Sequence, residues 1–300
     1  MFDGVIPPIA TPFLRDTLDT APVAETIARL MDAGLRGVLV LGTNGEAPYV
    51  DQDEADLLIE AVRHALPADR TLLAGAGRDS TRATVEACRR AALLGADAVL
   101  VRPPMAFVGQ MTESALEAHY RAVADVSPAP VMLYNQPAAF GVSLSAALVA
   151  CLAAHPNVCG IKESSGLVGL VGEHVHGLPH DAAVVTGVAS TMYASLLVGA
   201  SGVIVAVANV VPALCVKLYD LVQARQLDDA LRLQRALAPL GHAVTAQFGV
   251  PGLKAAMSLA GYAGTEPRLP LRPAPDVAVA VIRGLMARLE EETGARVLAT

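Results

Sequence analysis

The sequence predicts an α/β protein built as a (β/α)8 TIM barrel with a helical C-terminal extension. The first observation is a repeated unit, which occurs as GLRGVLV from Gly34, GADAVLV from Gly95 and GASGVIV from Gly199. Each unit has a glycine after an amphipathic stretch and then a β-branched apolar run, which is typical of a helix end that leads into a buried strand. The second observation is that eight such apolar runs alternate with helical patterns, as a barrel of this type requires.

The eight candidate strands follow one another along the first two thirds of the chain. They span residues 4–10, 34–40, 71–77, 95–101, 130–135, 158–163, 183–188 and 199–205. Helical patterns separate them. The stretch DQDEADLLIEAVRHAL, for example, begins with Asp51 and Glu54 at the spacing of a capping box. An open, doubly wound sheet is disfavoured because no GxGxxG phosphate-binding motif follows the first strand.

The last third of the chain is helical in pattern. From Pro212 onward it contains stretches such as LDDALRLQRALAPL and DVAVAVIRGLMARLEEE, whose apolar residues recur at helical spacing. We therefore expect the barrel at residues 1–211, and a barrel-closing helix followed by a helical extension at residues 212–300. Since no low-complexity linker separates the two parts, they are expected to form one domain.

Composition and charge favour a small molecule as the ligand. The chain has 300 residues, a net charge of −7 and arginines that are mostly spread singly and form no long run, which argues against nucleic acid or an anionic membrane as a partner. The stretch from Ala182 to Val216 has no charged residue, but glycines, Asn209 and Pro212 interrupt it. Strands and helices around a buried sheet are therefore expected there rather than a membrane span.

The cysteines indicate the compartment. The four cysteines form neither a CxxC pair nor a Cys/His metal-ligand spacing, so they are expected to be free thiols in a reducing environment with no bound metal. The N-terminal segment MFDGVIPPIATPF has Asp3 where a signal peptide would be basic, and prolines interrupt its apolar stretch. These features predict a cytoplasmic protein.

Polar residues gather at the C-terminal ends of the candidate strands, where TIM-barrel enzymes carry their active sites. The glycine-rich turn GTNGE is of a kind whose backbone N–H groups can bind an anion, although ordinary turn chemistry explains it equally well. The segments concerned are GTNGE (42–46), RPPMAF (102–107), YNQPAAFG (134–141), KESSG (162–166) and TGVAST (186–191).

Lys162 stands at the end of an apolar run and is one of only three lysines. Strand alternation places Val158 and Gly160 with Lys162 on the barrel-facing side, and Cys159 and Glu163 on the opposite side. Lys162 and Glu163 therefore cannot pair with each other. Burial disfavours the ammonium ion and favours the neutral amine, which is the form that attacks a carbonyl carbon. From position alone, a structural lysine that pairs with a carboxylate of another strand remains the alternative.

The other two lysines, Lys217 and Lys254, lie in helical patterns and are expected on the surface. Tyr134 ends the fifth candidate strand, which neighbours the sixth. Its hydroxyl is therefore expected to reach an adduct formed on Lys162. A buried tyrosine with a purely structural role is the alternative interpretation.

Taken together, the GTNGE turn, the YNxPxxxG segment at 134–141 and the GIKES strand at 160–164 resemble the dihydrodipicolinate synthase and N-acetylneuraminate lyase family of pyruvate-handling class I aldolases. The resemblance runs from GVIPPIATPF to about Leu271. It implies a (β/α)8 barrel with C-terminal helices, assembly as a homotetramer, a 2-oxo acid substrate, and a covalent Schiff base on Lys162 in place of a cofactor.

The resemblance also implies roles for individual residues. Lys162 would form the imine with the 2-oxo acid, and Tyr134 would shuttle protons with the help of Thr43. The backbone of Thr43 and Asn44 would hold the carboxylate of the 2-oxo acid. The remaining residues that would line the pocket are Ser164, Gly187 and Val205.

Two positions depart from the family pattern. The synthase has an arginine after its YNxP segment that grips the carboxylate of the aldehyde substrate, and the matching residue here is Ala139. The family also carries a tyrosine pair after the fourth strand, where this chain has RPPMAF, and neither Met105 nor Phe107 has a hydroxyl. Lysine biosynthesis is therefore disfavoured, and the proton relay must be shorter or use water.

Among the subfamilies, Asn44 of GTNGE and the segments LLAGAGRDSTRATVE and FGVPGLK most resemble 4-hydroxy-2-oxoglutarate aldolase, a lyase that releases pyruvate and glyoxylate. Arg102 and Arg78, both near strand ends, are the candidates to bind the distal carboxylate of such a substrate. The alternatives are a 2-keto-3-deoxy sugar-acid aldolase or dehydratase, a dihydrodipicolinate synthase, and a non-catalytic barrel that binds a 2-oxo acid.

Overall fold

A computed structural model describes residues 2–299. Its central feature is a sheet of eight strands in the order β1-β10-β9-β8-β7-β6-β5-β4, with every neighbouring pair parallel. Each strand lies within one of the predicted segments. The strands are β1 (Gly4–Val5), β4 (Gly37–Val40), β5 (Thr71–Gly75), β6 (Ala98–Val101), β7 (Val131–Asn135), β8 (Val158–Glu163), β9 (Ala183–Thr186) and β10 (Gly202–Val203).

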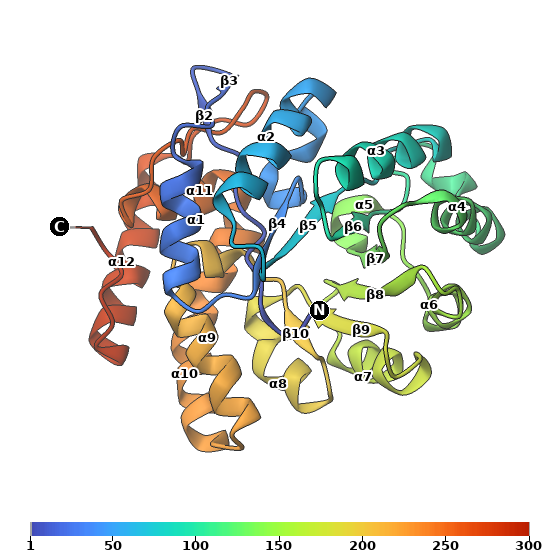
Figure 1. The fold of residues 1–300 in the computed structure, drawn as a ribbon. Helices are drawn as coiled ribbons and strands as arrows, with labels where there is room; N and C mark the ends of the chain where they lie inside the picture. Colours follow the sequence, from blue (N-terminus) through green and yellow to red (C-terminus); the bar gives the residue numbers. More distant parts are fainter. Residues whose placement is uncertain (1, 300) are drawn as a thin grey trace.

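The two edges of this sheet meet just after β1. Pro8 and Leu39 form a parallel bridge, in which the N–H of Ile9 donates to the Leu39 carbonyl at 2.9 Å and the N–H of Leu39 donates to the Pro7 carbonyl at 2.9 Å. The bridge joins the first and last strands of the order, so the sheet closes into a barrel with helices outside it (Figure 1). The predicted (β/α)8 fold is confirmed.

Several of the helices between the strands begin at a side chain that caps the helix. The Asp51 side chain accepts from the Glu54 N–H and the Glu54 side chain from the Asp51 N–H, so the predicted capping box is formed. Ser80 and Thr112 cap the two helices that follow. The barrel helices are α1 (Val23–Asp32), α2 (Gln52–Ala65), α3 (Thr81–Leu93), α4 (Glu113–Val126), α6 (Ala146–Ala153), α7 (Val168–Gly177), α8 (Met192–Leu197) and α9 (Pro212–Gln223).

Short elements fill the loops. A small hairpin formed by β2 (Phe13–Leu14) and β3 (Thr17–Leu18) follows the first strand. Several of the other turns stand directly after a barrel strand, at the end where the polar segments lie. They are η1 (Thr43–Gly45), η2 (Ala47–Tyr49), η3 (Val108–Gln110), α5 (Pro137–Phe140), η4 (Ala189–Thr191) and η5 (Ala206–Asn209).

The chain after α9 forms a helical layer on one side of the barrel (Figure 1). It comprises α10 (Leu227–His242), the π-helical turn η6 (Ala243–Gln247), α11 (Gly249–Leu259) and α12 (Asp276–Thr293). The uncharged stretch from Ala182 to Val216 contains two strands, the short helix α8 and the start of α9, so strands and helices of the barrel lie there as predicted. Among residues 2–299, no helix combines the length and apolarity that crossing a membrane would need.

The apolar interior has two layers. The outer layer lies between the strands and the helices and includes Val158, Ile161 and Val205. The inner layer fills the barrel, as is usual for this fold. Its buried members are Phe2, Ile6, Leu39, Leu73, Ala98, Leu100, Met132, Tyr134, Phe140, Val185 and Ile204, with Met105, Cys159 and Ala183 partly buried against them.

Strand β8 differs from the simple alternation that we expected. The register against β7 shifts between Val131 and Met132, so that Val158 pairs with Val131 while Gly160 pairs with Met132. One extra residue of β8 therefore stands in a bulge. As a result Val158 belongs to the outer layer and Cys159 packs against the inner one, the reverse of the prediction for these two residues.

Gly160 makes the bulge sterically feasible. Its φ is +143°, and a Cβ at this position would lie 2.0 Å from the Ala183 carbonyl oxygen of the next strand. Only glycine fits such a close approach. Beyond Gly160 the alternation resumes, and Tyr134 and Lys162 pair in register.

Candidate active site

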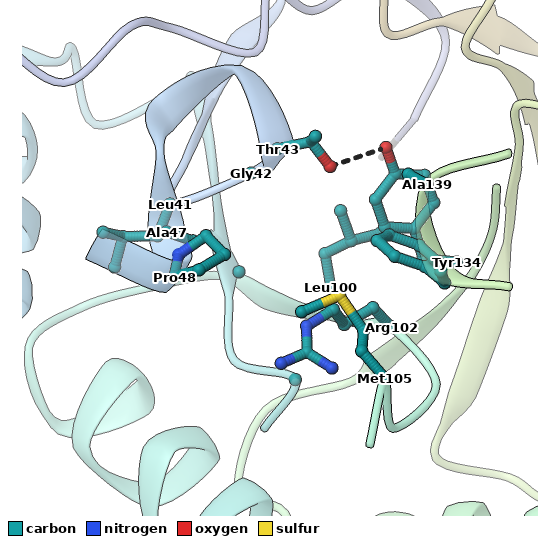
Figure 2. A pocket seen from close by; sticks show the side chains of 13 residues that line it. Leu41, Gly42, Thr43, Ala47, Pro48, Leu100, Arg102, Met105, Tyr134 and Ala139 are labelled. Carbon is teal, nitrogen blue, oxygen red and sulfur yellow. Dashed lines mark hydrogen bonds between the residues drawn. The ribbon is translucent and has the colours of Figure 1, made fainter. Parts of the chain in front are cut away.

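A cavity of about 180 Å³ opens at the C-terminal ends of β4, β5, β6 and β7. Most of its lining is apolar, and Thr43, Tyr134 and Arg102 bring the polar groups (Figure 2). This is the end of the barrel at which the sequence predicted the functional groups. The lining residues are Leu41, Gly42, Thr43, Ala47, Pro48, Gly75, Gly77, Leu100, Arg102, Met105, Tyr134, Ala139 and Phe140.

Lys162 is not one of the residues that line this cavity, but it contacts the ring of Tyr134, which is. Its side chain comes from the end of β8 and is buried, with 3% of the residue's surface exposed. Its Nζ lies 4.3 Å from the centroid of the Tyr134 ring on the neighbouring strand. No carboxylate among residues 2–299 forms an ion pair with it. The alternative of a lysine held in a salt bridge is therefore not supported within the described residues.

Ser164 and Gly187 surround the Lys162 side chain. A Cβ at residue 187 would lie 1.8 Å from the Ser164 Oγ and 3.1 Å from the Lys162 Cε, so the absence of a side chain at Gly187 makes room for both. The Ser164 Oγ is buried and has no hydrogen-bond partner within the described part of the chain. A buried hydroxyl without a partner is costly unless a ligand or water satisfies it.

Three side chains meet at the mouth of the barrel. The hydroxyls of Thr43 and Tyr134 lie 3.3 Å apart (Figure 2), and Thr43 comes from η1 while Tyr134 ends β7. The Oε1 of Gln136 accepts hydrogen bonds from both hydroxyls, from Thr43 at 3.3 Å and from Tyr134. Gln136 is not among the site residues predicted from the sequence. Its signal was its position two residues after Tyr134, because strand alternation returns to the same face after two residues.

The turn η1 offers N–H groups for an anion. Its hydrogen bonds run from Gly45 to the Gly42 carbonyl at 3.0 Å and from Glu46 to the Thr43 carbonyl at 3.2 Å. The N–H groups of Thr43 and Asn44 have no protein acceptor within residues 2–299, as expected for the first groups of a helical turn. They are therefore available to an oxyanion.

Glu163 lies on the opposite face of β8 from Lys162, as the alternation predicted. Its carboxylate accepts from the Asn135 side chain at 2.8 Å and from the Ser165 N–H at 2.6 Å, and it lies 3.3 Å from Nε2 of the buried His174 on α7. Burial alone would raise the pKa of Glu163, but the hydrogen bonds from His174, Ser165 and Asn135 outweigh that effect and hold the pKa below its ordinary value.

The structure separates the two candidate arginines. Arg102 lines the cavity, and its Nη1 lies 3.1 Å from the Asp79 carboxylate. Arg78 is not among the lining residues, and its guanidinium donates to the Gly77 carbonyl at 3.1 Å. Val205 is fully buried in the outer layer, so any contact with a ligand would have to come from its backbone.

The two departures from the family pattern are both near the cavity. Ala139 and Met105 are part of its lining. Phe107 is 82% exposed and points its ring away from the core at a left-handed backbone position, φ +54°. Neither Met105 nor Phe107 places a donor near Tyr134. Within residues 2–299, no group of three or more His, Cys, Asp or Glu side chains is arranged to hold a metal ion.

The prediction that Lys254 lies on the surface is wrong. Its side chain is 1% exposed, and its Nζ lies 2.5 Å from the carboxylate of Glu46, which is the last residue of the GTNGE turn. The same ammonium donates to the Thr11 carbonyl at 2.8 Å and the Glu266 carbonyl at 2.7 Å. Burial lowers the pKa of Lys254, and its hydrogen bond to Glu46 opposes this shift only in part. The helical pattern around Lys254 does not reveal this partner, which is distant in sequence.

Comparison with known proteins agrees with this geometry. The model of the dihydrodipicolinate synthetase family matches residues 1–282. The chain belongs to this family. It is 33% identical, over 96% of its length and 94% of the relative, to a probable mitochondrial 4-hydroxy-2-oxoglutarate aldolase of Emericella nidulans. It is 36% identical, over 90% of its length and 94% of the relative, to a 4-hydroxy-tetrahydrodipicolinate synthase of Methanosphaerula palustris.

Solved structures of the dihydrodipicolinate synthetase family share the barrel. A prophage protein of E. coli K12, solved in complex with pyruvate, has a TM-score of 0.90 and 29% identity, covering 97% of this chain and 99% of that chain. The protein is therefore an enzyme of the class of pyruvate-dependent lyases and synthases, and the family resemblance drawn from its motifs is confirmed. Relatives with aldolase names and relatives with synthase names are similarly close.

Proposed function

We propose that the protein is a Schiff-base aldolase that cleaves 4-hydroxy-2-oxoglutarate to pyruvate and glyoxylate. The observation that carries the proposal is the placement of one buried amine against one tyrosine, with Lys162 Nζ 4.3 Å from the Tyr134 ring centroid and the Tyr134 hydroxyl 3.3 Å from that of Thr43. A nucleophilic amine with hydroxyls in hydrogen-bond contact is what imine formation and its proton transfers need.

Cleavage begins when the neutral amine of Lys162 adds to C2 of the 2-oxo acid, and loss of one water gives the iminium ion. The C4 hydroxyl then gives up its proton, the C3–C4 bond breaks, and its electron pair moves toward the iminium nitrogen as an enamine. The aldehyde leaves. The enamine takes up a proton at C3, and one water hydrolyses the iminium to pyruvate and free Lys162. Tyr134 accepts and returns protons at the nitrogen and oxygen atoms of the adduct.

The pyruvate half of the substrate would be held around η1 and β8. Its carboxylate would accept from the free N–H groups of Thr43 and Asn44, which form an anion-binding turn. The unpaired hydroxyl of Ser164, next to Lys162 and Gly187, would donate to the same half. Such contacts would place C2 against the amine, which is the main contribution of a binding site to a two-reactant step.

The distal half would enter the cavity beyond Tyr134. Its lining holds a single cationic side chain, Arg102, among mostly apolar neighbours, and Ala139 brings no charge. One guanidinium suits one carboxylate, whereas a polyhydroxylated chain would find few hydrogen-bond partners there. These features favour the short 4-hydroxy-2-oxo dicarboxylate over a sugar acid, and over aspartate semialdehyde, for which the synthase uses the arginine that Ala139 replaces.

The deciding experiment compares three reactions on the purified protein. We expect kcat/KM to be highest for cleavage of 4-hydroxy-2-oxoglutarate, lower for cleavage of 2-keto-3-deoxygluconate and lower for condensation of pyruvate with aspartate semialdehyde. Borohydride reduction in the presence of pyruvate should add one pyruvate-derived mass to Lys162, located by peptide mapping. A preference for either competitor refutes the substrate, and an adduct on another lysine or none refutes the Schiff base and favours a non-catalytic binding barrel.

Arg102 gives a test of the distal subsite. Arg102→Leu should lower kcat/KM for 4-hydroxy-2-oxoglutarate by about tenfold or more, a larger effect than on reactions of pyruvate alone, which has no distal carboxylate. The exposed Arg82 of the nearby helix α3 provides a matched control, since Arg82→Leu removes the same charge outside the cavity. Equal effects of the two variants on kcat/KM would show that Arg102 does not bind the distal carboxylate.

We also propose that the enzyme works as a homotetramer in the cytoplasm, without a bound cofactor or metal. The family resemblance supports the assembly, and the free thiols of all four cysteines support a reducing compartment. Light scattering coupled to size-exclusion chromatography tests the assembly directly, and a mass near that of one chain would contradict it. Dialysis against a chelator should leave turnover unchanged.

A further inference from the structure

We propose that Gln136 is a positioning residue of the proton relay, and that its side-chain amide holds the hydroxyls of Tyr134 and Thr43 in place. This inference rests on the proposed Schiff-base chemistry of Lys162. The RPPMAF segment supplies no hydroxyl to a relay, so another side chain is needed to hold Tyr134 and Thr43 in place. The amide comes from the same chain as the two hydroxyls, two residues beyond Tyr134.

The contacts of Gln136 carry the argument. Its Oε1 accepts from the Thr43 hydroxyl at 3.3 Å and from the Tyr134 hydroxyl, which is the full capacity of an amide oxygen with two lone pairs. Elsewhere among residues 2–299 its side chain has no hydrogen-bond partner. It precedes α5, yet its side chain does not cap that helix. The amide therefore serves the two hydroxyls and no structural role in the backbone.

The chemistry of an amide suits this position. Tyr134 must exist in two forms during turnover, as the phenol before it gives up its proton and as the phenolate afterwards. The Oε1 of Gln136 accepts from the phenol, and after a rotation of the amide its Nε2 donates to the phenolate. A neutral amide does not itself take or release the proton. It holds the oxygen of Tyr134 in one place in both states.

Thr43 is joined to the same arrangement. Its hydroxyl lies 3.3 Å from both the Tyr134 oxygen and the Gln136 Oε1, so the three side chains form a closed triangle of polar atoms. The triangle connects η1, which carries the free N–H groups, with the end of β7. Removing the amide would leave Tyr134 and Thr43 with only each other and water, and the Tyr134 ring would keep its packing against Phe140.

The test follows a reaction that needs no aldehyde. A Schiff base with pyruvate exchanges the methyl protons of pyruvate for solvent deuterium through the enamine, and proton NMR measures the rate. We expect Gln136→Met to lower kcat for this exchange about tenfold, the effect of about one hydrogen bond, with KM for pyruvate changed less than about twofold. Gln223→Met, at an exposed site on α9, is the matched control and should retain the wild-type rate.

A second variant reports on the form of Tyr134. Gln136→Glu keeps the shape and the acceptor oxygen but adds a negative charge next to the Tyr134 hydroxyl, which disfavours the phenolate. We expect kcat for the exchange to be higher than in Gln136→Met, although below the wild-type value. In the pH–rate profile of the exchange, the limb that is absent from Tyr134→Phe should shift to higher pH. A purely structural residue would change the thermal midpoint without moving that limb.

The outcomes are distinguishable. If the wild-type protein neither exchanges pyruvate protons nor gives a borohydride adduct, the proposed function fails and the relay with it. If the wild-type protein does both, and Gln136→Met keeps the wild-type kcat, only the role of Gln136 is refuted. A loss of exchange that tracks a lowered thermal midpoint in circular dichroism, with an unshifted profile in Gln136→Glu, also refutes it.

Discussion

Tyr134 is the residue at which the site converges. The Nζ of Lys162 lies 4.3 Å from the centroid of its ring. The ring also packs edge-on against the ring of Phe140, with the two centroids 5.0 Å apart and the two planes at 83°. Its hydroxyl contacts Thr43 and Gln136. The ring thus contributes to packing, while the hydroxyl alone belongs to the proposed relay. Because the two roles lie on different atoms, one substitution can separate them.

Tyr134→Phe should lower turnover by about 10²–10⁴, the usual range for a positioned acid–base group. The ring and its contact with Phe140 remain, so the thermal midpoint should change little. Steady-state kinetics and a thermal melt of the same preparation check both parts. Near-native turnover would remove Tyr134 from the mechanism, and a large fall in the midpoint would show that the hydroxyl has a structural role.

Strand β8 is the element that orients Lys162, the proposed nucleophile. Lys162 points from one face into the barrel, and Glu163 on the other face contacts Asn135 of β7 and His174 of α7. A buried carboxylate with these partners fixes the strand between its neighbours. Because alternation links the two faces, a correctly seated Glu163 sets the direction of Lys162.

Glu163→Gln should therefore weaken the fold at neutral pH by about 1–3 kcal/mol, since it removes a charged acceptor from buried donors. The pKa of Glu163 is lowered in the folded state, so its contribution is complete above the ordinary carboxyl value and is lost as the pH falls through the lowered value. Wild type and variant should thus differ at pH 7 and converge in acid.

Urea unfolding between pH 7 and pH 3 measures this difference. Glu173→Gln on the exposed side of α7 is the control, and it should show little effect at any pH. A stability difference for Glu163→Gln that stays constant down to low pH would mean that shape, rather than charge, is what the position requires.

For the whole molecule, the buried pair of Lys254 and Glu46 joins the C-terminal helices to the active-site turn. Lys254 lies on α11, and Glu46 directly follows η1 at a left-handed backbone position, φ +54°. The second oxygen of Glu46 accepts from the Arg268 N–H at 2.8 Å. The extension therefore holds the turn that carries Thr43, although it lies outside the barrel itself.

Lys254→Met should lower the free energy of unfolding by about 3–5 kcal/mol, because it leaves the Glu46 carboxylate buried and without its cation. Adding Glu46→Gln to this variant should recover part of the loss, since the double variant has no unpaired buried charge. The exposed Lys217→Met on α9 serves as the control. Chemical denaturation of the wild type, Lys254→Met, Glu46→Gln and the double variant measures the cycle, and additive losses in the double variant would contradict the coupling.

The sequence by itself determined the fold and the family. Barrel strands are β-branched runs of a few residues, and their helices begin at local signals such as Asp51 with Glu54, so short windows of sequence contain the information. The segments GTNGE, YNQPAAFG and KESSG also stand in the right order at strand ends. That is why the sequence predicts that Lys162, Tyr134 and Thr43 are neighbours.

Tertiary structure alone decided the features that depend on atoms far apart in the chain. The bulge that turns Cys159 inward follows from the register between β7 and β8, and the choice of Arg102 over Arg78 depends on which guanidinium reaches the cavity. The predicted surface position of Lys254 is wrong because its partner, Glu46, lies about two hundred residues away in the sequence. The periodicity of a helix or strand predicts which face a side chain lies on. The free energy of a buried charge or amide depends instead on its partner, and only the folded chain brings the partners together.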